Sequence, residues 1–216
     1  MASPTDIKIL SDLSILVRGA GRAGTAIARR LVGAGIPRVA LTELPTPRTP
    51  FPRATFAGAL LQGEIDVEGL RAKKAEYYFE FVNIWGDGMV PVFADPAADV
   101  KERFLPIVLV DAAGVPHETR PDPLDAPMIV GIGPGFAATE VHARVVVGGP
   151  SNGRLVYPGR PEWGVVDCPQ ELPSQEEAGV PPWARGVAGA VLEAVVALFN
   201  LNFSYKGYPR RPGTLL

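Results

Sequence analysis

Short apolar runs alternate with stretches of helical spacing along the first part of the chain. Residues 14–17 form an apolar run that ends at a glycine, and residues 22–34 have the apolar spacing of a helix that ends at Gly35. Residues 38–44 form a second apolar run, which finishes on Glu43 and Leu44. Together these segments predict a βαβ unit, in which two parallel strands are joined by a right-handed crossover.

The next segment combines a proline-rich loop with shorter elements. The stretch LPTPRTPFPR contains four prolines and excludes regular structure, and ATFAGALLQG after it predicts a short helix that ends at Gly63. EIDVEGLRAKKA is compatible with either a hairpin strand or a helix. Residues 75–86 predict a helix, and we expect its aromatic and apolar stripe to pack in the core: Tyr78, Phe81, Val82 and Trp85.

Three further apolar runs have the length of strands: VPVFAD, PIVLVDA and PMIVGIG. The sequence therefore predicts an α/β fold with five or six mostly parallel strands and helices on both faces of the sheet. After Gly135 we expect short strands, an irregular stretch and a helix over residues 183–200 that is apolar on nearly every face. A soft boundary near residue 125 divides the chain into parts 1–125 and 126–216, or else the chain forms one domain.

Composition and charge narrow the classes of partner. The chain has 216 residues, 47% hydrophobic and 20% charged, which is typical of a soluble globular protein. Its 21 Lys and Arg against 23 Asp and Glu leave no basic field for nucleic acid. The most apolar window, residues 187–201, contains Glu193 and Asn200 and is too short and polar to span a membrane. Such a helix is expected to lie inside the fold or in a homo-oligomer interface.

Cys168 is the only cysteine, so the sequence excludes an internal disulfide and a zinc site of the paired-cysteine kind. A reducing, cytoplasmic setting fits this composition best, because MASPTDIKIL at the start lacks the pattern of a signal peptide. The thiol is either a bystander or a sulfur-handling group.

The stretch RGAGRAG matches the pattern G-x-G-x-x-G with Gly19, Gly21 and Gly24. In a Rossmann-like fold these glycines make a tight turn, let backbone approach a diphosphate and let the helix pack on the strand. Glu43, about 20 residues on, is placed to bind a ribose diol, which favours NAD over NADP; the alternative is an exposed acid at a strand end. Arg22 faces either a phosphate or solvent.

A second glycine-rich loop, GIGPGF, follows the apolar residues 128–130. It contains Gly133, Pro134, Gly135 and Phe136. Because the carboxyl ends of parallel strands share one edge of the sheet, both glycine loops are expected there and would form a two-sided pocket. The alternative is a structural turn with Phe136 in the core.

Three residues are candidate acids or bases. Asp111 ends the run IVLVD, His117 lies in a proline-bounded loop, and His142 follows the second glycine loop. Each also has a structural interpretation: a cap or turn for the aspartate, and a hydrogen-bonded structural role for each histidine. No trio of metal ligands is visible, and the sequence contains no Tyr-x-x-x-Lys pair or comparable set of residues for hydride transfer.

Three stretches resemble the YqeB-type accessory proteins of the selenium-dependent molybdenum hydroxylase system: RGAGRAGTAIARRL, PRATFAGALLQGEIDVEG and DAPMIVGIGPGFAATEVHA. The resemblance covers roughly residues 14–157 and implies a Rossmann-like protein that assists the maturation of molybdenum hydroxylases. It implies these positions for the family's loops, acid, arginine and histidine: Gly19, Gly21, Gly24, Glu43, Arg53, Gly133, Pro134, Gly135, Phe136 and His142. The chain departs from the family pattern at Arg22, where an acid is usual, and after the VHA segment.

Three hypotheses follow. The first is an accessory protein that binds a diphosphate-containing cofactor, either NAD or a molybdopterin dinucleotide, whose diphosphate and ribose suit the same loop. The second is an NAD-dependent oxidoreductase that uses Asp111, His117 or His142. The third is a non-catalytic subunit that joins a partner, such as a molybdenum hydroxylase or a second copy, through residues 187–201.

Overall fold

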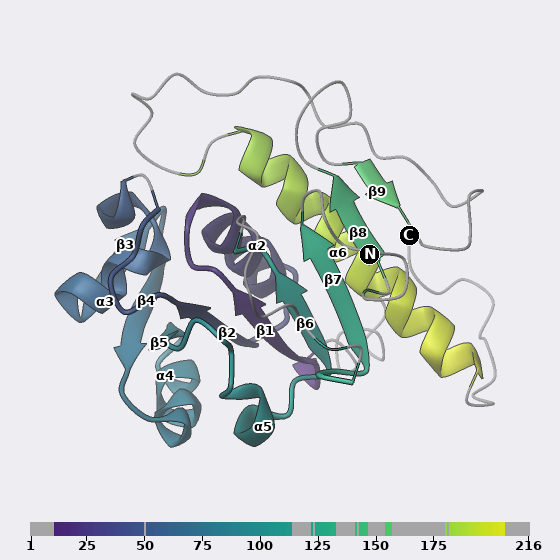
Figure 1. The fold of residues 1–216 in the computed structure, drawn as a ribbon, viewed down its shortest axis with the longest axis horizontal. Helices are drawn as coiled ribbons and strands as arrows, with labels where there is room; N and C mark the ends of the chain where they lie inside the picture. Colours follow the sequence, from purple (N-terminus) through teal and green to yellow (C-terminus); the bar gives the residue numbers. More distant parts are fainter. Residues whose placement is uncertain are drawn as a thin grey trace.

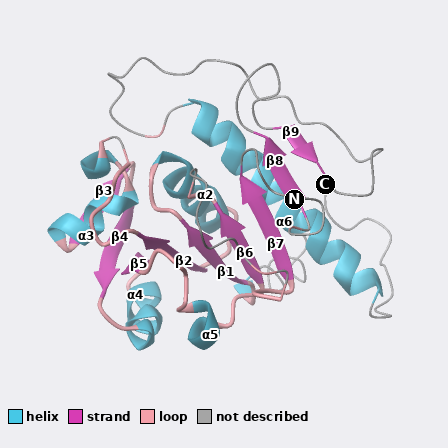
Figure 2. Cartoon of the chain, in the orientation of Figure 1, coloured by secondary structure: helices cyan, strands magenta, loops and turns pink. Residues whose placement is uncertain are grey.

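The computed structural model describes residues 11–49, 51–113, 122, 124–132, 141, 143–146, 154–156, 180 and 182–205. Figure 2 shows the described strands as one twisted row, with helices packed against the sheet. The strands are β1 Ser14–Arg18, β2 Arg38–Glu43, β3 Glu64–Val67, β4 Leu70–Ala75, β5 Val90–Ala94, β6 Val108–Asp111, β7 Met128–Ile132, β8 Ala143–Val146 and β9 Arg154–Val156. The α-helices are α2 Arg22–Gly33, α3 Ala59–Gln62, α4 Phe81–Gly86, α5 Lys101–Phe104 and α6 Pro182–Tyr205.

The order of the described strands is that of a Rossmann-like sheet. They follow the order β3-β4-β5-β2-β1-β6-β7-β8-β9, and all neighbours from β4 to β8 are parallel. Strands β5-β2-β1-β6-β7-β8 reproduce the 3-2-1-4-5-6 order of a doubly wound fold. The chain therefore changes direction across the sheet between β1 and β6, and the predicted fold class is confirmed.

Helices cover both faces of the sheet (Figure 1). On one face, Ile27 and Leu31 of α2 pack with Val187 and Val191 of α6 over the odd-numbered positions of β1, such as Ile15. On the other face, Leu16 lies in a second core. That core includes aromatic and aliphatic side chains of α4 and the segment before β6: Phe81, Ile84, Val100 and Phe104. The side chains of β1 therefore alternate between the two cores, because successive side chains of a strand point to opposite faces of the sheet.

Two differences from the sequence prediction concern the edge of the sheet. Residues 64–75 form the antiparallel hairpin β3–β4, and β4 pairs in parallel with β5, so the parallel part has seven described strands, more than predicted. Because β4 runs to Ala75, the predicted helix over 75–86 begins later, with a 3-10 turn at Tyr78–Glu80 and then α4. The division near residue 125 stays a prediction; β7, beyond it, pairs with β6.

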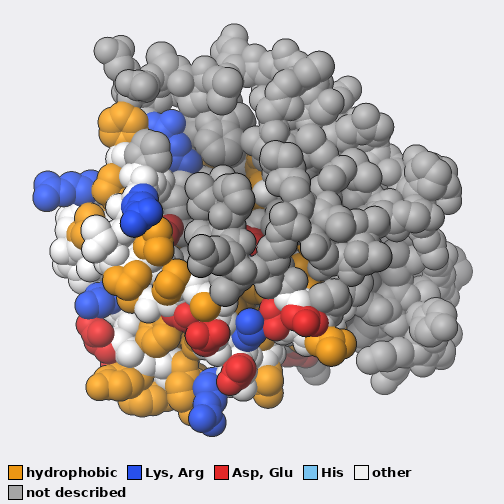
Figure 3. Space-filling view, viewed as in Figure 1, with side chains coloured by type: hydrophobic (Ala, Val, Ile, Leu, Met, Phe, Trp, Pro, Cys, Tyr) orange, Lys and Arg blue, Asp and Glu red, His pale blue; other side chains and the backbone are white. Residues whose placement is uncertain are grey.

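The aromatic stripe of this segment is only half buried. Phe81 is buried, and the indole N–H of Trp85 donates to the carbonyl of Val39 at 2.8 Å. Tyr78 and Val82 are 45% and 69% exposed, so the prediction that they pack in the core is wrong. Tyr78 lies in the exposed 3-10 turn before α4, and Val82 lies on α4, which buries Phe81 and Ile84 instead. Figure 3 shows apolar side chains gathered on the lower left of the molecule, where α4 lies in Figure 1.

Helix α6 packs beside α2, and seven of its described apolar side chains are buried. They are Ala184, Val187, Ala188, Ala190, Val191, Ala194 and Val195. The prediction that this helix lies inside the fold is confirmed for these residues, and its use in a homo-oligomer stays a prediction. Among the described helices, none combines the length and apolarity needed to cross a membrane.

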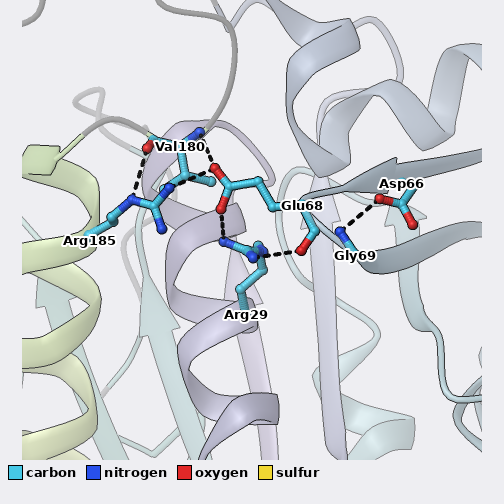
Figure 4. Close-up of polar contacts among 6 residues, drawn as sticks. All are labelled: Arg29, Asp66, Glu68, Gly69, Val180 and Arg185. Atoms are coloured by element: carbon cyan, nitrogen blue, oxygen red, sulfur yellow. Dashed lines mark hydrogen bonds and ion pairs between the residues drawn. The ribbon is translucent and has the colours of Figure 1, made fainter.

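Glu68, at the tip of the β3–β4 hairpin, ties three elements together (Figure 4). Its carboxylate accepts hydrogen bonds from Arg29 of α2, from Arg185 of α6 at 2.7 Å and from the Val180 N–H at 3.3 Å. Arg29 also donates to the Glu68 carbonyl oxygen at 2.9 Å, and the Arg185 Nε–H donates to the Val180 carbonyl oxygen at 3.2 Å. The hairpin therefore holds Val180 and the start of α6.

The environment of Glu68 favours its charged form. Burial alone would raise the pKa of this carboxyl, but the Val180 N–H and the positive charges of Arg29 and Arg185 outweigh burial and lower the pKa below its usual value. The fold therefore stabilises the carboxylate relative to the unfolded chain.

A second ion pair is buried between β1 and β6. The Arg18 guanidinium and the Asp111 carboxylate are 3.1 Å apart, and the two residues are 3% and 5% exposed. The Arg18 Nε–H also donates to the Pro96 carbonyl oxygen at 2.8 Å, and the Ala113 N–H donates to Asp111 at 3.2 Å. These bonds connect the carboxyl ends of β1, β5 and β6 on the face opposite α2.

Replacement of Glu68 tests the pH dependence of stability. Because its pKa is lowered in the folded chain, its contribution is complete above the unfolded-state pKa and is lost as the pH falls through the folded-state pKa. We expect urea midpoints of the wild type to fall more between about pH 6 and pH 3 than those of Glu68→Gln. Glu76→Gln, at an exposed ion pair with Lys74, is the control. Equal pH slopes for wild type and Glu68→Gln would contradict this account.

Replacement of Asp111 tests the buried ion pair. Asp111→Asn removes the carboxylate charge that faces the buried Arg18 guanidinium, so we expect a loss of about 3–5 kcal/mol in the free energy of unfolding. The exposed pair Arg71–Glu64, also at 3.1 Å, provides the control, and Glu64→Gln should cost no more than about 1 kcal/mol. Urea denaturation measures both, and similar losses for the two variants would show that burial of the Asp111 pair contributes nothing.

Candidate functional site

The first glycine of the pattern makes the turn that leaves β1. Gly19 has a φ of +96°, a conformation that L side chains rarely adopt, and its N–H donates to the Thr42 carbonyl oxygen at 2.7 Å. A β-carbon at Gly19 would lie 2.9 Å from the Ala112 carbonyl oxygen. This position therefore needs glycine for its backbone angle and because the chain after β6 passes close by.

The third glycine brings α2 onto the end of β1. A β-carbon at Gly24 would lie 1.8 Å from the carbonyl oxygen of Gly19. The next residue, Thr25, holds the turn from within the helix: its hydroxyl donates to the Ala20 carbonyl oxygen at 3.1 Å and accepts from the Phe56 N–H at 2.9 Å. The helix packing predicted for Gly24 is present, and Thr25 adds a contact that the glycine pattern did not indicate.

The second glycine begins α2. Gly21 is the N-cap residue, no side chain caps the helix there, and its first turn contains no acidic residue. A β-carbon at Gly21 would lie 2.8 Å from the hydroxyl oxygen of Thr49, in the proline-rich loop after β2. The face of Gly21 that a diphosphate would approach is therefore bordered by Thr49. The helix end itself presents N–H groups and a partial positive charge, which suit an anion.

Glu43 lies beside the glycine loop, as its place at the end of β2 predicts. One carboxylate oxygen accepts from the Ala20 N–H at 2.9 Å, and the other accepts from the Leu44 N–H at 2.8 Å. The side chain thus fixes the loop and the start of the following segment. Each carboxylate oxygen has a further lone pair, so the arrangement leaves acceptor capacity for a ribose hydroxyl. Binding of ribose by Glu43 stays a prediction.

Arg22 is half-buried and faces an aromatic ring. Its guanidinium carbon lies 5.1 Å from the centre of the Phe51 ring, within the range of a cation–π contact. Arg53 is exposed in the 3-10 turn Pro52–Ala54, which precedes α3. Arg22 therefore contacts the proline-rich loop, and Arg53 is part of it. A contact of either with phosphate stays a prediction.

Asp111 reaches the carboxyl edge of the sheet but is bound to Arg18, so the structure places it in an ion pair. Sequence periodicity could not indicate this partner, because the pairing depends on the register that sets Arg18 beside Asp111 across β1 and β6. Its role as an acid or base stays a prediction.

The remaining candidates lie outside the described residues: His117, His142, Gly133, Pro134, Gly135, Phe136 and Cys168. Strand β7, which precedes the second glycine loop, is parallel to β6 and ends at the same edge of the sheet as β1. Within the part of the chain that the structure describes, no group of three His, Cys, Asp or Glu residues is placed to hold a metal ion.

Two contacts of the site were missed by sequence reasoning. Thr25 follows the third glycine directly, and a hydroxyl in the first turn of a helix is a signal that could have indicated it. Thr49 lies among four prolines, in a stretch without periodicity, so nothing in the pattern indicates that it returns to Gly21.

Comparison with known proteins gives one sequence relative of note. No protein-family model matches the chain. A protein of Escherichia coli (strain K12), named "Uncharacterized protein YqeB", is 32% identical over 171 residues. That match covers 77% of this chain and 29% of the E. coli protein, so the chain spans less than a third of its relative.

Among solved structures, TcdA (CsdL) aligns over 92% of this chain and 90% of its own, with a TM-score of 0.45 and 13% sequence identity. The alignment of 171 residues with the E. coli protein, at 32% identity, supports a YqeB-type family for this chain.

Proposed function

We propose that the chain is a Rossmann-like accessory protein that holds the diphosphate of a dinucleotide cofactor at the glycine loop and the start of α2. One observation carries this proposal: Gly19, Gly21 and Gly24 open a helix without a side-chain cap or an acidic first turn, beside Glu43 and next to the change of direction between β1 and β6. Ligands of open α/β sheets bind outside the carboxyl ends of the strands at such a point.

The chain's own residues fit the parts of such a ligand. The N–H groups of the first turn of α2 would face the diphosphate, and Glu43 would accept hydrogen bonds from the ribose diol. Arg22, in the first turn of α2, and Arg53, in the turn Pro52–Ala54, would add positive charge. For the diphosphate to reach Gly21, however, the side chain of Thr49 must move, because its hydroxyl lies against that glycine. A dinucleotide such as NAD or a molybdopterin dinucleotide would supply the reactive ring; the chain would bind and orient it.

The accessory role in this proposal is inferred from the resemblance to YqeB-type proteins. The resemblance to YqeB-type proteins implies a partner among the molybdenum hydroxylases, and such a partner would receive the bound cofactor. The oxidoreductase alternative has less support, because Asp111, the one acid–base candidate among the described residues, is paired with Arg18. This chain would therefore bind the cofactor, and the partner enzyme would carry out the chemistry.

The two ligand classes are separated by analysis of what the purified chain retains. We expect a bound dinucleotide to be released on denaturation, with an adenine absorbance for NAD or a pterin absorbance together with molybdenum for a molybdopterin dinucleotide. A chain that retains neither, and whose melting temperature does not rise with NAD or nucleoside diphosphates, would contradict the proposed function.

Gly21→Asp tests the place of the diphosphate. A carboxylate at the start of α2 would repel the diphosphate, so we expect affinity for NAD to fall at least about tenfold by isothermal titration calorimetry. Gly33→Asp is the matched control, because it puts the same charge near the other end of α2, where a β-carbon meets nothing within 4 Å. Unchanged affinity in a folded Gly21→Asp variant would show that the diphosphate does not bind there.

A further inference from the structure

The segment after β2 passes over the glycine loop and is fixed at both ends. We call residues 44–49 and 51–55 the strap. At its start the Leu44 N–H donates to Glu43 at 2.8 Å. Just beyond its end the Phe56 N–H donates to the Thr25 hydroxyl at 2.9 Å, and the Ala57 N–H donates to the Ala20 carbonyl oxygen at 3.0 Å. The ends of the strap are therefore fixed to the glycine loop and α2.

The middle of the strap meets the start of α2 through side chains. The Thr49 hydroxyl lies 2.8 Å from the position of a β-carbon on Gly21, and the Phe51 ring lies under the Arg22 guanidinium. Its prolines lack the N–H that a backbone hydrogen bond would need. Phe51 is 46% exposed and has a φ of +53°, which is unfavourable for a residue with a side chain. The bonds at the two ends of the strap, to Glu43, Thr25 and Ala20, are made by residues other than Thr49 and Phe51.

The position of Thr49 conflicts with the ligand. The second glycine of the pattern is small so that a diphosphate can approach the backbone, and here the space beside Gly21 holds the threonine side chain. A diphosphate and the Thr49 side chain cannot both occupy it. The described conformation is accordingly a closed form of the site.

We propose that the strap is a lid that occludes the dinucleotide site, with Thr49 as the occluding side chain and the Arg22–Phe51 contact as the latch. This inference rests on the proposed function, because it concerns the same site. In a two-state equilibrium between closed and open strap, the affinity observed equals the affinity of the open form multiplied by the open fraction. Binding therefore requires the strap to open, and changes that favour the open form strengthen binding.

Thr49 variants of the full chain test this with NAD and ADP as probes. Thr49→Ala removes bulk beside Gly21, so we expect faster association by stopped flow and a lower Kd by calorimetry, by about tenfold if the strap is closed about 90% of the time. Thr49→Val keeps the volume, so occlusion by bulk predicts that it binds more weakly than Thr49→Ala does. Phe51→Ala releases the latch at an exposed position and should change both constants in the direction of Thr49→Ala.

Three different results would contradict the proposed lid. If Thr49→Ala and Thr49→Val weaken binding alike, the hydroxyl contacts the ligand and does not occlude it. If every variant binds as the wild type does, the strap is not a lid although the site binds dinucleotide. If neither the wild type nor any variant binds either probe, the proposed function fails together with the lid. Circular dichroism and melting temperature confirm that each variant is folded.

Discussion

The approach of α2 to the end of β1 is the constraint on which the site depends. At Gly24 a single added carbon would lie 1.8 Å from the carbonyl oxygen of Gly19, so the helix can begin where it does only because that side chain is absent. This placement sets the Ala20 carbonyl oxygen between Thr25 and Ala57, and the Ala20 N–H against Glu43. Through these bonds one close contact fixes the loop, β2 and the segment after β2 relative to one another.

The same geometry means that the three glycines alone do not establish a ligand site. Each of the three glycines meets part of the chain itself: Gly19 meets Ala112, Gly21 meets Thr49, and Gly24 meets Gly19. The glycines alone are therefore consistent with packing. What favours a ligand is the combination of the uncapped start of α2 with the change of direction between β1 and β6. In the proposed lid, the strap fills the space beside Gly21 in the closed form and leaves that space to a ligand in the open form.

Most of the sheet could be predicted from the sequence, because buried parallel strands appear as apolar runs and local signals mark where they end. Glu43 could be placed for the same reason: it ends such a run, and parallel strands end at one edge. The pairing of Asp111 with Arg18 could not, because it depends on register between strands 93 positions apart. Tyr78 was misplaced because β4 extends to Ala75 and leaves only a short turn before α4, and Val82 was misplaced because α4 buries Phe81 and Ile84 instead.

The most direct test of the central claim is a titration of the isotopically labelled chain with NAD, followed residue by residue through backbone amide NMR shifts. The account predicts the largest changes at the amides of Gly21, Arg22 and Ala23, which face the proposed diphosphate, with accompanying changes at Thr49 as the strap opens. Saturable shifts confined to other elements, with these amides unmoved, would contradict it.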